Sequence, residues 1–509
     1  MFKFVLVRNT ARLVFAVSIA IQWMIVDVKA QSNDYKHQEV KILNKTNYPN
    51  SLELSKNKEK LTKKNESDTI QLEEISILDN IYLPSEPNEV EISDLLPLKI
   101  DDIDSLITKR NPNILAMKNK INQSKLLLTR SLSDWYPKIN LSANGLPQYL
   151  QGEQDNSSTS NTSSSQLKSS ISLEIKWNLI DPKRIPEIAA ARDTFEKSKA
   201  SYLITLRDKK LEAYTSYFAL QKSKAGISIG KQSLRASKKS LDDSKSRFNA
   251  GIGTKLEVLE AETQVARDKQ LLSKKIKDQR VNRRALAEIL NLPPKINPIA
   301  ISPTETMGAW DLSLPRSILA AYSFRKELEE LSLDISINNS NANSALAAIQ
   351  PTISIFNTLN TSYSKGELLS ESPDMDKKTS TLNNTIGLNA SINIFDGGKA
   401  KASYKYNKKK AKEAELNFAF QRGKIRKEVE ESFYSLQMAI QDIISTNHEI
   451  NASKEALRLA NLRLEAGITT QREVVNNQRD LTEAEVRYTD AVADYNISLA
   501  QLNRYTGIT

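Results

Sequence analysis

The sequence contains no cysteine and only two histidines, His37 and His448. The lack of cysteine excludes disulfides, thiolate metal sites, a cysteine nucleophile and a lipid-anchored N-terminal cysteine. With so few histidines, we expect neither a histidine-rich metal site nor a Ser-His-Asp triad. No pair of acidic residues and no glycine-rich stretch forms a recognisable catalytic or phosphate-binding motif. The sequence therefore predicts a protein that is not an enzyme and that holds no cofactor or metal.

Large apolar residues are also scarce for a chain of 509 residues. Hydrophobic residues make up 39%, aromatic residues 6% and charged residues 26%, and the mean hydropathy is −0.46. At about 150 residues per domain, this length would suggest three compact domains. The composition leaves too little apolar volume for three thick cores, and long, thin helical structure fits it better.

The net charge of +11 gives no sign of nucleic-acid binding. Residues 1–30 carry four basic residues and one acidic residue, so +3 of the charge belongs to that segment and +8 to the rest. The remaining basic residues are mixed with acidic ones and are not interleaved with aromatics, as they would be in a nucleic-acid interface.

The N-terminus has the pattern of a secretory signal peptide. Arg8 and Arg12 precede an apolar run, 13–26, and small residues follow up to Ala30. This pattern predicts a signal peptide over 1–30, and the run is shorter than the roughly 20 residues of a membrane-spanning helix. The next segment, 31–95, is polar without apolar periodicity, which predicts a disordered arm.

The rest of the chain repeats itself at an offset of 214 to 216 residues. Corresponding landmarks are Arg110 and Arg325, Pro137 and Pro351, Leu179-Ile-Asp181 and Ile394-Phe-Asp396, and the segments 247–254 and 463–470. A linker with Pro293, Pro294, Pro298 and Pro303 separates the copies. This duplication predicts two structural repeats, 96–300 and 301–509.

Each repeat begins with a helix, about 101–134 or 315–347, followed by two alternating strands. A very long helix then runs to Ala250 or Ala466, and a helix of about 35 to 40 residues returns after a Gly/Thr break. The stretch from Pro186 to Ala250 would reach roughly 95 Å as a helix. Apolar residues recur every seven positions in the returning helices, which predicts antiparallel coiled-coil hairpins. They are Val258, Val265, Leu272 and Leu286, and Val474, Leu481, Tyr488, Tyr495 and Leu502.

The strands alternate apolar and polar residues over about ten positions, which is typical of a strand between lipid and a wet lumen. A half-buried sheet covered by helices is a commoner cause of this pattern. The signal peptide, the duplication and the long helices favour the membrane, with polar loops at 151–168 and 361–383. The predicted lipid-facing residues are Ile171, Leu173, Ile175, Trp177, Leu179, Ile386, Leu388, Ile392 and Ile394.

Four membrane strands in one chain require an oligomer. An open four-stranded sheet in lipid would leave unpaired backbone groups at its edges, at several kcal/mol each. The smallest transmembrane barrels have about eight strands. Two chains would supply eight strands and three would supply twelve, and the residues alone do not choose between them.

These elements resemble the TolC-like outer-membrane efflux protein family over residues 96–509. The similar stretches are Arg110-Asn-Pro112, the strand entries at Pro137 and Pro351, Ile394-Phe-Asp-Gly-Gly-Lys399, 247–262, 463–478 and Leu502-Asn-Arg-Tyr-Thr-Gly507. Each motif is degenerate by itself, and their duplicated arrangement is specific.

The resemblance implies a mainly α fold with a small β part, in which each repeat has a strand pair and a long helical hairpin. It further implies a homotrimer whose twelve-stranded barrel in the outer membrane continues into an α-helical tunnel through the periplasm. Such a channel would dock on a periplasmic adaptor and an inner-membrane transporter. It would then open for efflux of small molecules or for type I-like protein secretion. The alternative is a periplasmic coiled-coil adaptor or scaffold without a pore.

The resemblance also implies functional residues at the two turns between the long helices. The adaptor-docking tips would be Gly251, Ile252, Gly253, Thr254, Gly467, Ile468, Thr469 and Thr470. A purely structural role for the glycines is equally compatible with the sequence, because glycine permits a tight turn. Glu257, Glu260 and Glu473 match positions where the family often has acidic residues, and three copies would form rings that favour cations. Solvated helix-face glutamates are the simpler interpretation, and Asn476 stands where a second acidic residue of the second copy is expected.

Overall fold

The computed structural model describes residues 83–154, 162–368 and 377–508. All of them belong to one compact unit, Leu72–Thr509. The predicted signal peptide, 1–30, and most of the predicted arm, 31–95, lie outside the described residues. Within 83–95 the structure has helix α2 (Pro87–Val90) and the start of strand β1 (Asp94–Leu98), so regular structure begins before residue 96.

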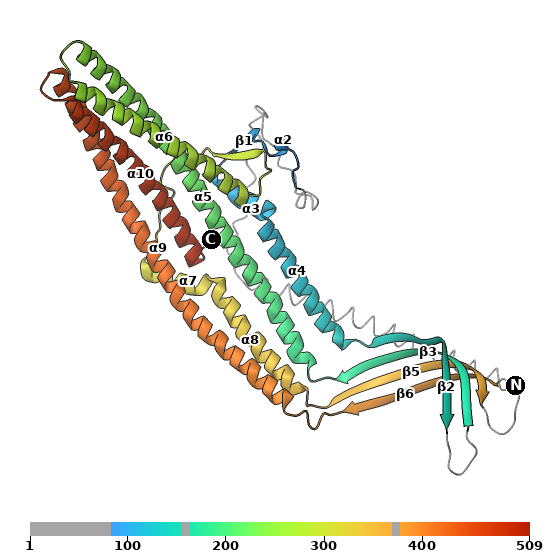
Figure 1. Cartoon of the computed structure of the whole chain (residues 1–509). Helices are drawn as coiled ribbons and strands as arrows, with labels where there is room; N and C mark the ends of the chain where they lie inside the picture. Colours follow the sequence, from blue (N-terminus) through green and yellow to red (C-terminus); the bar gives the residue numbers. More distant parts are fainter. Residues whose placement is uncertain (1–82, 155–161, 369–376, 509) are drawn as a thin grey trace, which may run out of the picture. The chain divides into compact units, whose positions relative to one another are not determined.

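The same order of elements occurs twice along the chain (Figure 1). Two helices lead into two long strands, a helix of 66 or 67 residues and a returning helix of 35 or 36 residues. The first run consists of α3 (Ile103–Arg110), α4 (Pro112–Leu132), β2 (Lys138–Gln154), β3 (Thr162–Ile180), α5 (Arg184–Asn249) and α6 (Lys255–Ile289), with the 3-10 turns η1 (Ile100–Asp102) and η2 (Ser133–Trp135). The second consists of α7 (Leu314–Phe324), α8 (Lys326–Ala347), β5 (Thr352–Leu368), β6 (Lys377–Ser391), α9 (Lys399–Glu465) and α10 (Gln471–Thr506). The described part of the chain is therefore mainly helical with a small sheet, as predicted.

The leading helix of each run is interrupted once, and the prediction of a continuous helix was wrong at that point. Asn111 is extended (φ −67°, ψ 120°), and its side chain accepts hydrogen bonds from the N–H groups of Asn113 and Ile114 as an N-cap. Pro112 follows, and a residue before proline is disfavoured in the helical region. Arg325 (φ −76°, ψ 121°) separates α7 from α8 in the same way without a proline.

The long helices form the two predicted hairpins. At 1.5 Å per residue, the 66 residues of α5 extend about 99 Å. Helix α6 packs along α5, α10 packs along α9, and α10 also lies against α5, so the two hairpins are joined side by side (Figure 1). The seven-residue apolar stripe correctly predicted the packed faces, since the buried stripe residues include Val258, Leu286, Val474, Tyr495 and Leu502.

Two hydrophobic cores form where the hairpins, away from their tips, meet the shorter helices. The first contains Ile103, Tyr217, Leu220 and Leu286, and the second contains Ile425, Val429, Tyr495 and Leu502. Each core is made mainly by one repeat, although Ile497 and Ala500 of α10 pack against the first. This sharing ties the two repeats together.

The main sheet has the order β2-β3-β5-β6, with every neighbouring pair antiparallel. Its strands have 15 to 19 residues, well beyond the ten predicted from alternation. The prediction of loops over 151–168 and 361–383 was wrong for 151–154, 162–168, 361–368 and 377–383, where backbone pairing continues into these Ser/Thr-rich segments. The middle of each predicted loop, 155–161 and 369–376, lies outside the described residues. Hydrogen bonding between strands does not require apolar side chains, so alternation marked only part of each strand.

A second, two-stranded sheet was missed by the sequence reasoning. Strand β4 (Ile296–Ala300) lies in the proline-rich linker and pairs in parallel with β1, with Leu98 opposite Ala300. Pro298 is tolerated there because the sheet has only edge strands. The linker between the repeats is thereby fixed to the start of the first repeat.

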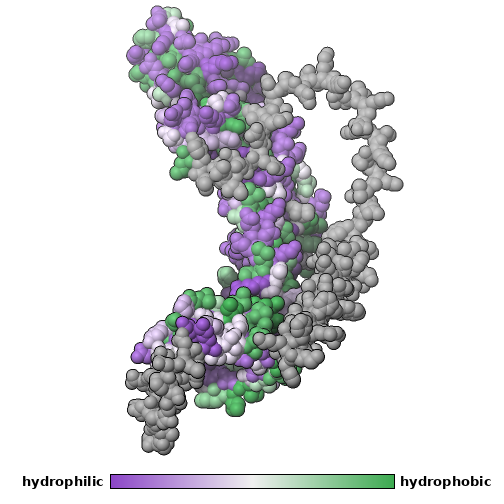
Figure 2. Space-filling model, turned by 90° about the vertical axis from the view of Figure 1, so that its right-hand side faces the viewer, coloured by the Kyte–Doolittle hydropathy of each residue, from purple (hydrophilic) through white to green (hydrophobic). Residues whose placement is uncertain are grey.

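Hydrophobic surface is distributed unevenly. The end that carries the hairpin tips is mainly hydrophilic in Figure 2, and hydrophobic patches gather toward the end that carries the sheet. None of the helices in the described residues combines the length and the apolar character needed to cross a membrane.

Candidate functional site: the hairpin tips and the sheet face

The turn between α5 and α6 closes with a Schellman motif. Gly251 has φ +76°, and its N–H donates to the carbonyl of Phe248 at 3.0 Å. The N–H of Ile252 donates to the carbonyl of Arg247, also at 3.0 Å. Glycine is required because a left-handed residue satisfies the last carbonyls of the helix. Ile252 is left 67% exposed at the outer end of the turn.

The turn between α9 and α10 repeats this geometry. Gly467 has φ +71°, its N–H donates to Leu464, and the N–H of Ile468 donates to the carbonyl of Arg463 at 2.8 Å. Ile468 is 70% exposed. The sequence repeat therefore corresponds to one backbone turn made twice, each presenting an isoleucine to solvent at the end of its hairpin.

The acidic residues at the two tips have different partners. Thr254 caps α6, and its Oγ1 accepts from the N–H of Glu257 while the Glu257 carboxylate accepts from the N–H of Thr254, each at 3.2 Å. Glu257 is thus half of a capping box. At the second tip, Glu473 accepts from Nη1 of Arg463 at 3.0 Å and from the hydroxyl of Thr469. Both carboxylates serve the local turn in the single chain.

Glu260 connects the two hairpins. Its Oε1 accepts from Nε of Arg472 at 2.8 Å, which joins the second turn of α6 to the first turn of α10. Close by, the side chain of Gln471 donates to Ser240 of α5, and farther along the hydroxyl of Thr482 donates to Ser233 at 3.1 Å. These contacts exist because α5, α6 and α10 pack side by side. The periodicity of a single helix does not show which helices pack together, so the partners could not be predicted from it.

The sheet brings six of the nine predicted lipid-facing residues onto one face. Partners in register share a face, and Leu173 lies opposite both Leu141 and Leu359, while Trp177 lies opposite Ile355. The apolar residues of this face are Ile139, Leu141, Ala143, Ile171, Leu173, Ile175, Trp177, Ile353, Ile355, Leu359, Leu382, Ile386, Leu388 and Ala390, and the register also places Asn357, Thr361 and Asn384 on it. The other face carries mainly Asn, Ser, Thr, Glu and Lys.

Three of the nine residues do not occupy the predicted strand positions. Leu179 lies at a register shift, and Ile180 takes its place opposite Ile353. Ile392 and Ile394 follow the end of β6, because β5 begins at Thr352, directly after Pro351, and offers no partner beyond Ser391. Proline lacks the N–H that a further ladder bond would need. Both isoleucines are exposed.

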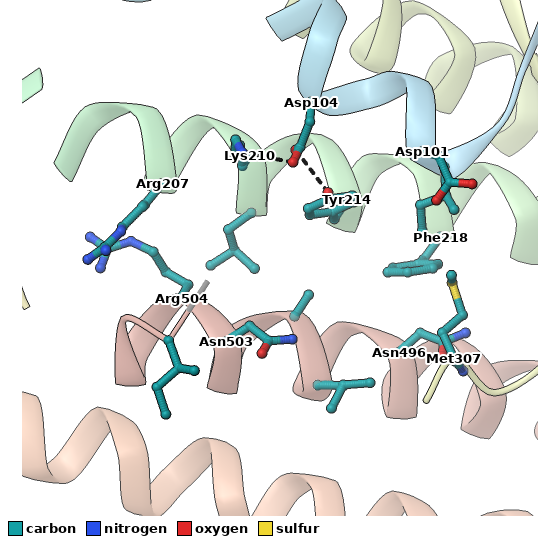
Figure 3. Close-up of a pocket in the computed structure, with 15 residues that line it drawn as sticks. Asp101, Asp104, Arg207, Lys210, Tyr214, Phe218, Met307, Asn496, Asn503 and Arg504 are labelled. Carbon is teal, nitrogen blue, oxygen red and sulfur yellow. Dashed lines mark hydrogen bonds and ion pairs between the residues drawn. The ribbon is translucent and has the colours of Figure 1, made fainter. Parts of the chain in front are cut away.

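A pocket of about 400 Å³ between α5 and α10 was not predicted (Figure 3). Helix α5 contributes Arg207, Lys210 and Tyr214, and Asp104 of α3 accepts from the Lys210 ammonium at 2.7 Å and from the Tyr214 hydroxyl at 2.9 Å. Burial and the hydrogen bond to Asp104 raise the pKa of Tyr214. The phenol therefore stays protonated as a donor that holds α3 on α5.

Beside this pocket, a buried ionic cluster joins four helices. Glu327 of α8 accepts from Arg325 at 2.6 Å and from Arg504 of α10 at 2.8 Å. Arg325 also pairs with Glu428 of α9, and Arg504 donates to Asp208 of α5 at 2.7 Å. Burial disfavours the charged form of Glu327, but the Arg325 hydrogen bond and the charges of Arg504 and Arg325 outweigh it and lower its pKa to about 2. The sequence marked Arg325 only as a repeat landmark.

Within 83–154, 162–368 and 377–508, no cluster of three or more His, Asp or Glu residues has the arrangement of a metal site. The features that distinguish the described residues are therefore surfaces: a sheet with one apolar face, and two exposed hairpin turns.

The sequence model of the outer membrane efflux protein family matches this chain at residues 105–292 and 320–508, one match within each predicted repeat. The chain belongs to this family. The family lies in the outer membrane and functions in efflux, so this chain is an outer-membrane efflux protein. Comparison with curated protein sequences finds no match.

Solved structures of outer-membrane channels have the same fold. The chain is similar to the outer-membrane channel OprN, with a TM-score of 0.69 and 17% identity over 80% of this chain and 89% of that one. The CmeC channel of Campylobacter jejuni gives a TM-score of 0.67 with 15% identity, covering 80% of this chain and 85% of that one. The open state of MtrE of Neisseria gonorrhoeae gives 0.63 with 16% identity, covering 80% and 88%. With sequence identities of 15% to 17%, these similarities show a shared fold.

Proposed function

We propose that three copies of this chain form a passive exit duct. The observation that carries the proposal is the four-stranded sheet, which has one apolar face and two edge strands, β2 and β6. Each edge strand pairs on one side only among the described residues. In lipid each open edge would cost several kcal/mol per unpaired group. Pairing β2 of one copy with β6 of the next removes every edge, and three copies close a barrel of twelve strands.

The helical hairpins would continue this barrel as a tunnel through the periplasm. The repeats 96–300 and 301–509 would each supply one hairpin, after removal of a signal peptide at 1–30. The tips, 251–254 and 467–470, would dock on a periplasmic adaptor that connects the duct to an inner-membrane transporter. The cargo would be small molecules or, in type I-like secretion, polypeptides, and the duct itself performs no catalysis.

Cysteine pairs test the closure directly, because the chain has no cysteine of its own. One cysteine is placed on β2, for example Asn140→Cys, and the second is scanned along β6 through Thr385, Gly387 and Asn389. Each protomer then carries both halves of the joint, so oxidation of the correct register should yield covalent trimers on denaturing gels. The matched control carries the β2 cysteine alone.

Planar-bilayer recording tests the pore. We expect discrete conductance from the purified protein, which should need detergent for extraction. A protein that extracts in aqueous buffer, forms no channels and gives no covalent trimer would instead be a periplasmic coiled-coil adaptor or scaffold without a pore.

Docking at the tips has a separate test. We expect Ile252→Asp together with Ile468→Asp to abolish cross-linking of the tips to an adaptor in cells while leaving bilayer conductance unchanged. Leu319→Asp is the control, since Leu319 of α7 is similarly exposed, at 65%. Cross-linking that survives both tip substitutions would place the adaptor elsewhere.

A further inference from the structure

A polar pocket of about 460 Å³ lies where the second repeat leaves the sheet. Its walls are the end of α8, the β6–α9 connection, the first turn of α9 and the turn that follows β3. The polar side chains that line it are Lys183, Asn341, Ser344, Asn393, Asp396, Lys399 and Ser403. It therefore lies at the end of the sheet nearest to the helices.

The first repeat fills the equivalent place with its own side chains. Arg184 is buried there, its guanidinium lies 4.2 Å from the centre of the Trp135 ring, and it donates to the carbonyl of Asn178. At the repeat offset, Arg184 corresponds to Lys399 and Trp135 corresponds to Ile349. Lys399 and Ile349 are both exposed, so the stacked pair has no counterpart in the second repeat.

The two lysines of this pocket have no carboxylate partner among the described residues, although Asp396 also lines it. Neither Lys183 nor Lys399 forms an ion pair with any residue that the structure describes. The carboxylate of Asp396 already accepts from the N–H groups of Gly398, at 2.8 Å, and Ala400, at 2.7 Å. The hydroxyl of Ser344 already donates to Glu187 at 3.0 Å. Two free ammonium groups with the amides of Asn341 and Asn393 and the hydroxyl of Ser403 beside them suit an anion with several acceptor oxygens, such as a phosphate group.

Apolar side chains adjoin this cationic pocket. Ile394 and Phe395 lie between the lining residues Asn393 and Asp396 and are 89% and 85% exposed, and Ile392 is 56% exposed. Apolar surface gains roughly 25 cal/mol per Å² when it is removed from water. A ligand that carries a phosphate group next to hydrocarbon would satisfy both halves of the site.

We propose that this pocket binds the phosphate of an anionic phospholipid in the periplasmic leaflet, with acyl chains against Ile392, Ile394 and Phe395. The inference rests on the proposed function, because it needs the sheet to span the bilayer. Lys183 comes from the first repeat and Lys399 from the second, so the lipid bridges the ends of β3 and β6. The bound lipid fills in the second repeat the place that the side chains of Arg184 and Trp135 fill in the first.

The test measures binding of vesicles of phosphatidylcholine with and without phosphatidylglycerol to the delipidated protein, together with the phospholipid that remains after purification. At about 1 kcal/mol per basic residue near an anionic surface, Lys183→Gln with Lys399→Gln should weaken phosphatidylglycerol binding roughly 30-fold. Lys401→Gln with Lys405→Gln is the matched control, because both lysines are exposed on α9 outside the pocket. Ala345→Phe, which fills the pocket without changing charge, should also reduce binding.

Equal losses in the pocket and control variants would overturn the site in favour of general charge attraction. Competition by inorganic phosphate or glycerol phosphate as strong as that by the lipid would also overturn it, since the ligand would then be a soluble phosphate. Bilayer conductance is recorded for every variant. Wild-type channels combined with unchanged lipid binding in the double variant reject the lipid site alone, whereas absence of wild-type channels rejects the proposed duct.

Discussion

Glu327 holds two arginines from different elements at the junction of both repeats. Its carboxylate accepts from Arg325 and Arg504, and its pKa is lowered to about 2 from an ordinary 4.5. A group whose pKa is lowered by folding stabilises the folded state above its unfolded pKa, and this stabilisation is lost as the pH falls toward the folded value. A shift of this size corresponds to about 3 kcal/mol.

We therefore expect the unfolding temperature of the wild type to fall steeply between pH 4.5 and 2. Glu327→Gln should be less stable at pH 7, because the buried guanidinium groups of Arg325 and Arg504 lose one of their two carboxylate partners. It should also lose most of the pH dependence in that range. Glu431→Gln is the control, as Glu431 lies on the exposed surface of α9. Parallel pH curves for Glu327→Gln and the wild type would contradict this role.

The Glu260–Arg472 pair holds the two tips together but contributes little to stability. Exposed ion pairs are worth about 0–1 kcal/mol, and the Arg472 side chain is 58% exposed. Glu260→Gln should leave the melting temperature nearly unchanged. In bilayers it should increase the open probability, because the N-terminal ends of α6 and α10 are then free to separate. Glu455→Gln, which removes a pair within α9 alone, is the control. Equal open probabilities would show that the pair does not restrain the entrance.

The sequence predicted where the tip turns lie because glycine at a helix end has a local cause. It did not predict what Glu257, Glu260 and Glu473 contact. The capping box of Thr254 and Glu257 does have a local sequence signal, a threonine followed three residues later by a glutamate. The partner of Glu260 lies 212 residues away, and only the packing of the hairpins brings it near.

At the scale of the strand, each face of the sheet has its own expected response to charge. Ile386→Arg with Leu388→Arg places two cations on the apolar face. At about 2–4 kcal/mol per charge near the middle of the bilayer, this double substitution should prevent assembly in the outer membrane. Thr385→Arg with Asn389→Arg, on the opposite face of the same strand, should be tolerated. Membrane flotation and trimer yield measure both. Equal tolerance of the two pairs would mean that the apolar face does not meet lipid.

Alternation predicted which strand residues share a face, but it did not predict where the strands end. Leu179 and Ile394 continue the alternating pattern, yet one lies at a register shift and the other lies beyond the last pair, Thr352 with Ser391. Register is a property of two strands together, so one strand's pattern contains only half of it. For the same reason, the parallel pairing of β1 with β4 was not foreseen.

At the scale of the whole assembly, three copies of Glu473 would form a ring at the periplasmic entrance. Glu473→Gln should weaken the preference of the channel for cations, measured as a shift of the reversal potential toward zero in a salt gradient. Arg463 already balances part of this charge, so the shift should be smaller than for an unpaired carboxylate. Glu465→Gln, a neighbouring exposed change, is the control. Unchanged selectivity would reject the ring.

The duplication was the most productive prediction at this scale. An offset of about 215 residues predicted two hairpins, and the family matches residues 105–292 and 320–508 in the same two parts. The chain count, by contrast, is not contained in one sequence. Four strands per chain require other copies of the chain to close a barrel, but they do not determine how many copies there are.

Helices α5 and α9 differ in length by a single residue, 66 against 67, and both end in the same Schellman turn with an outward isoleucine. A partner that contacts only this turn and its isoleucine would meet two near-equivalent positions on every chain. A partner that also contacts the neighbouring carboxylate would distinguish them, because one carboxylate caps its helix and the other pairs with arginine. Whether six or three copies of the partner bind around the proposed trimer would thus depend on whether the partner contacts Glu257 and Glu473, which form different hydrogen bonds at the two tips.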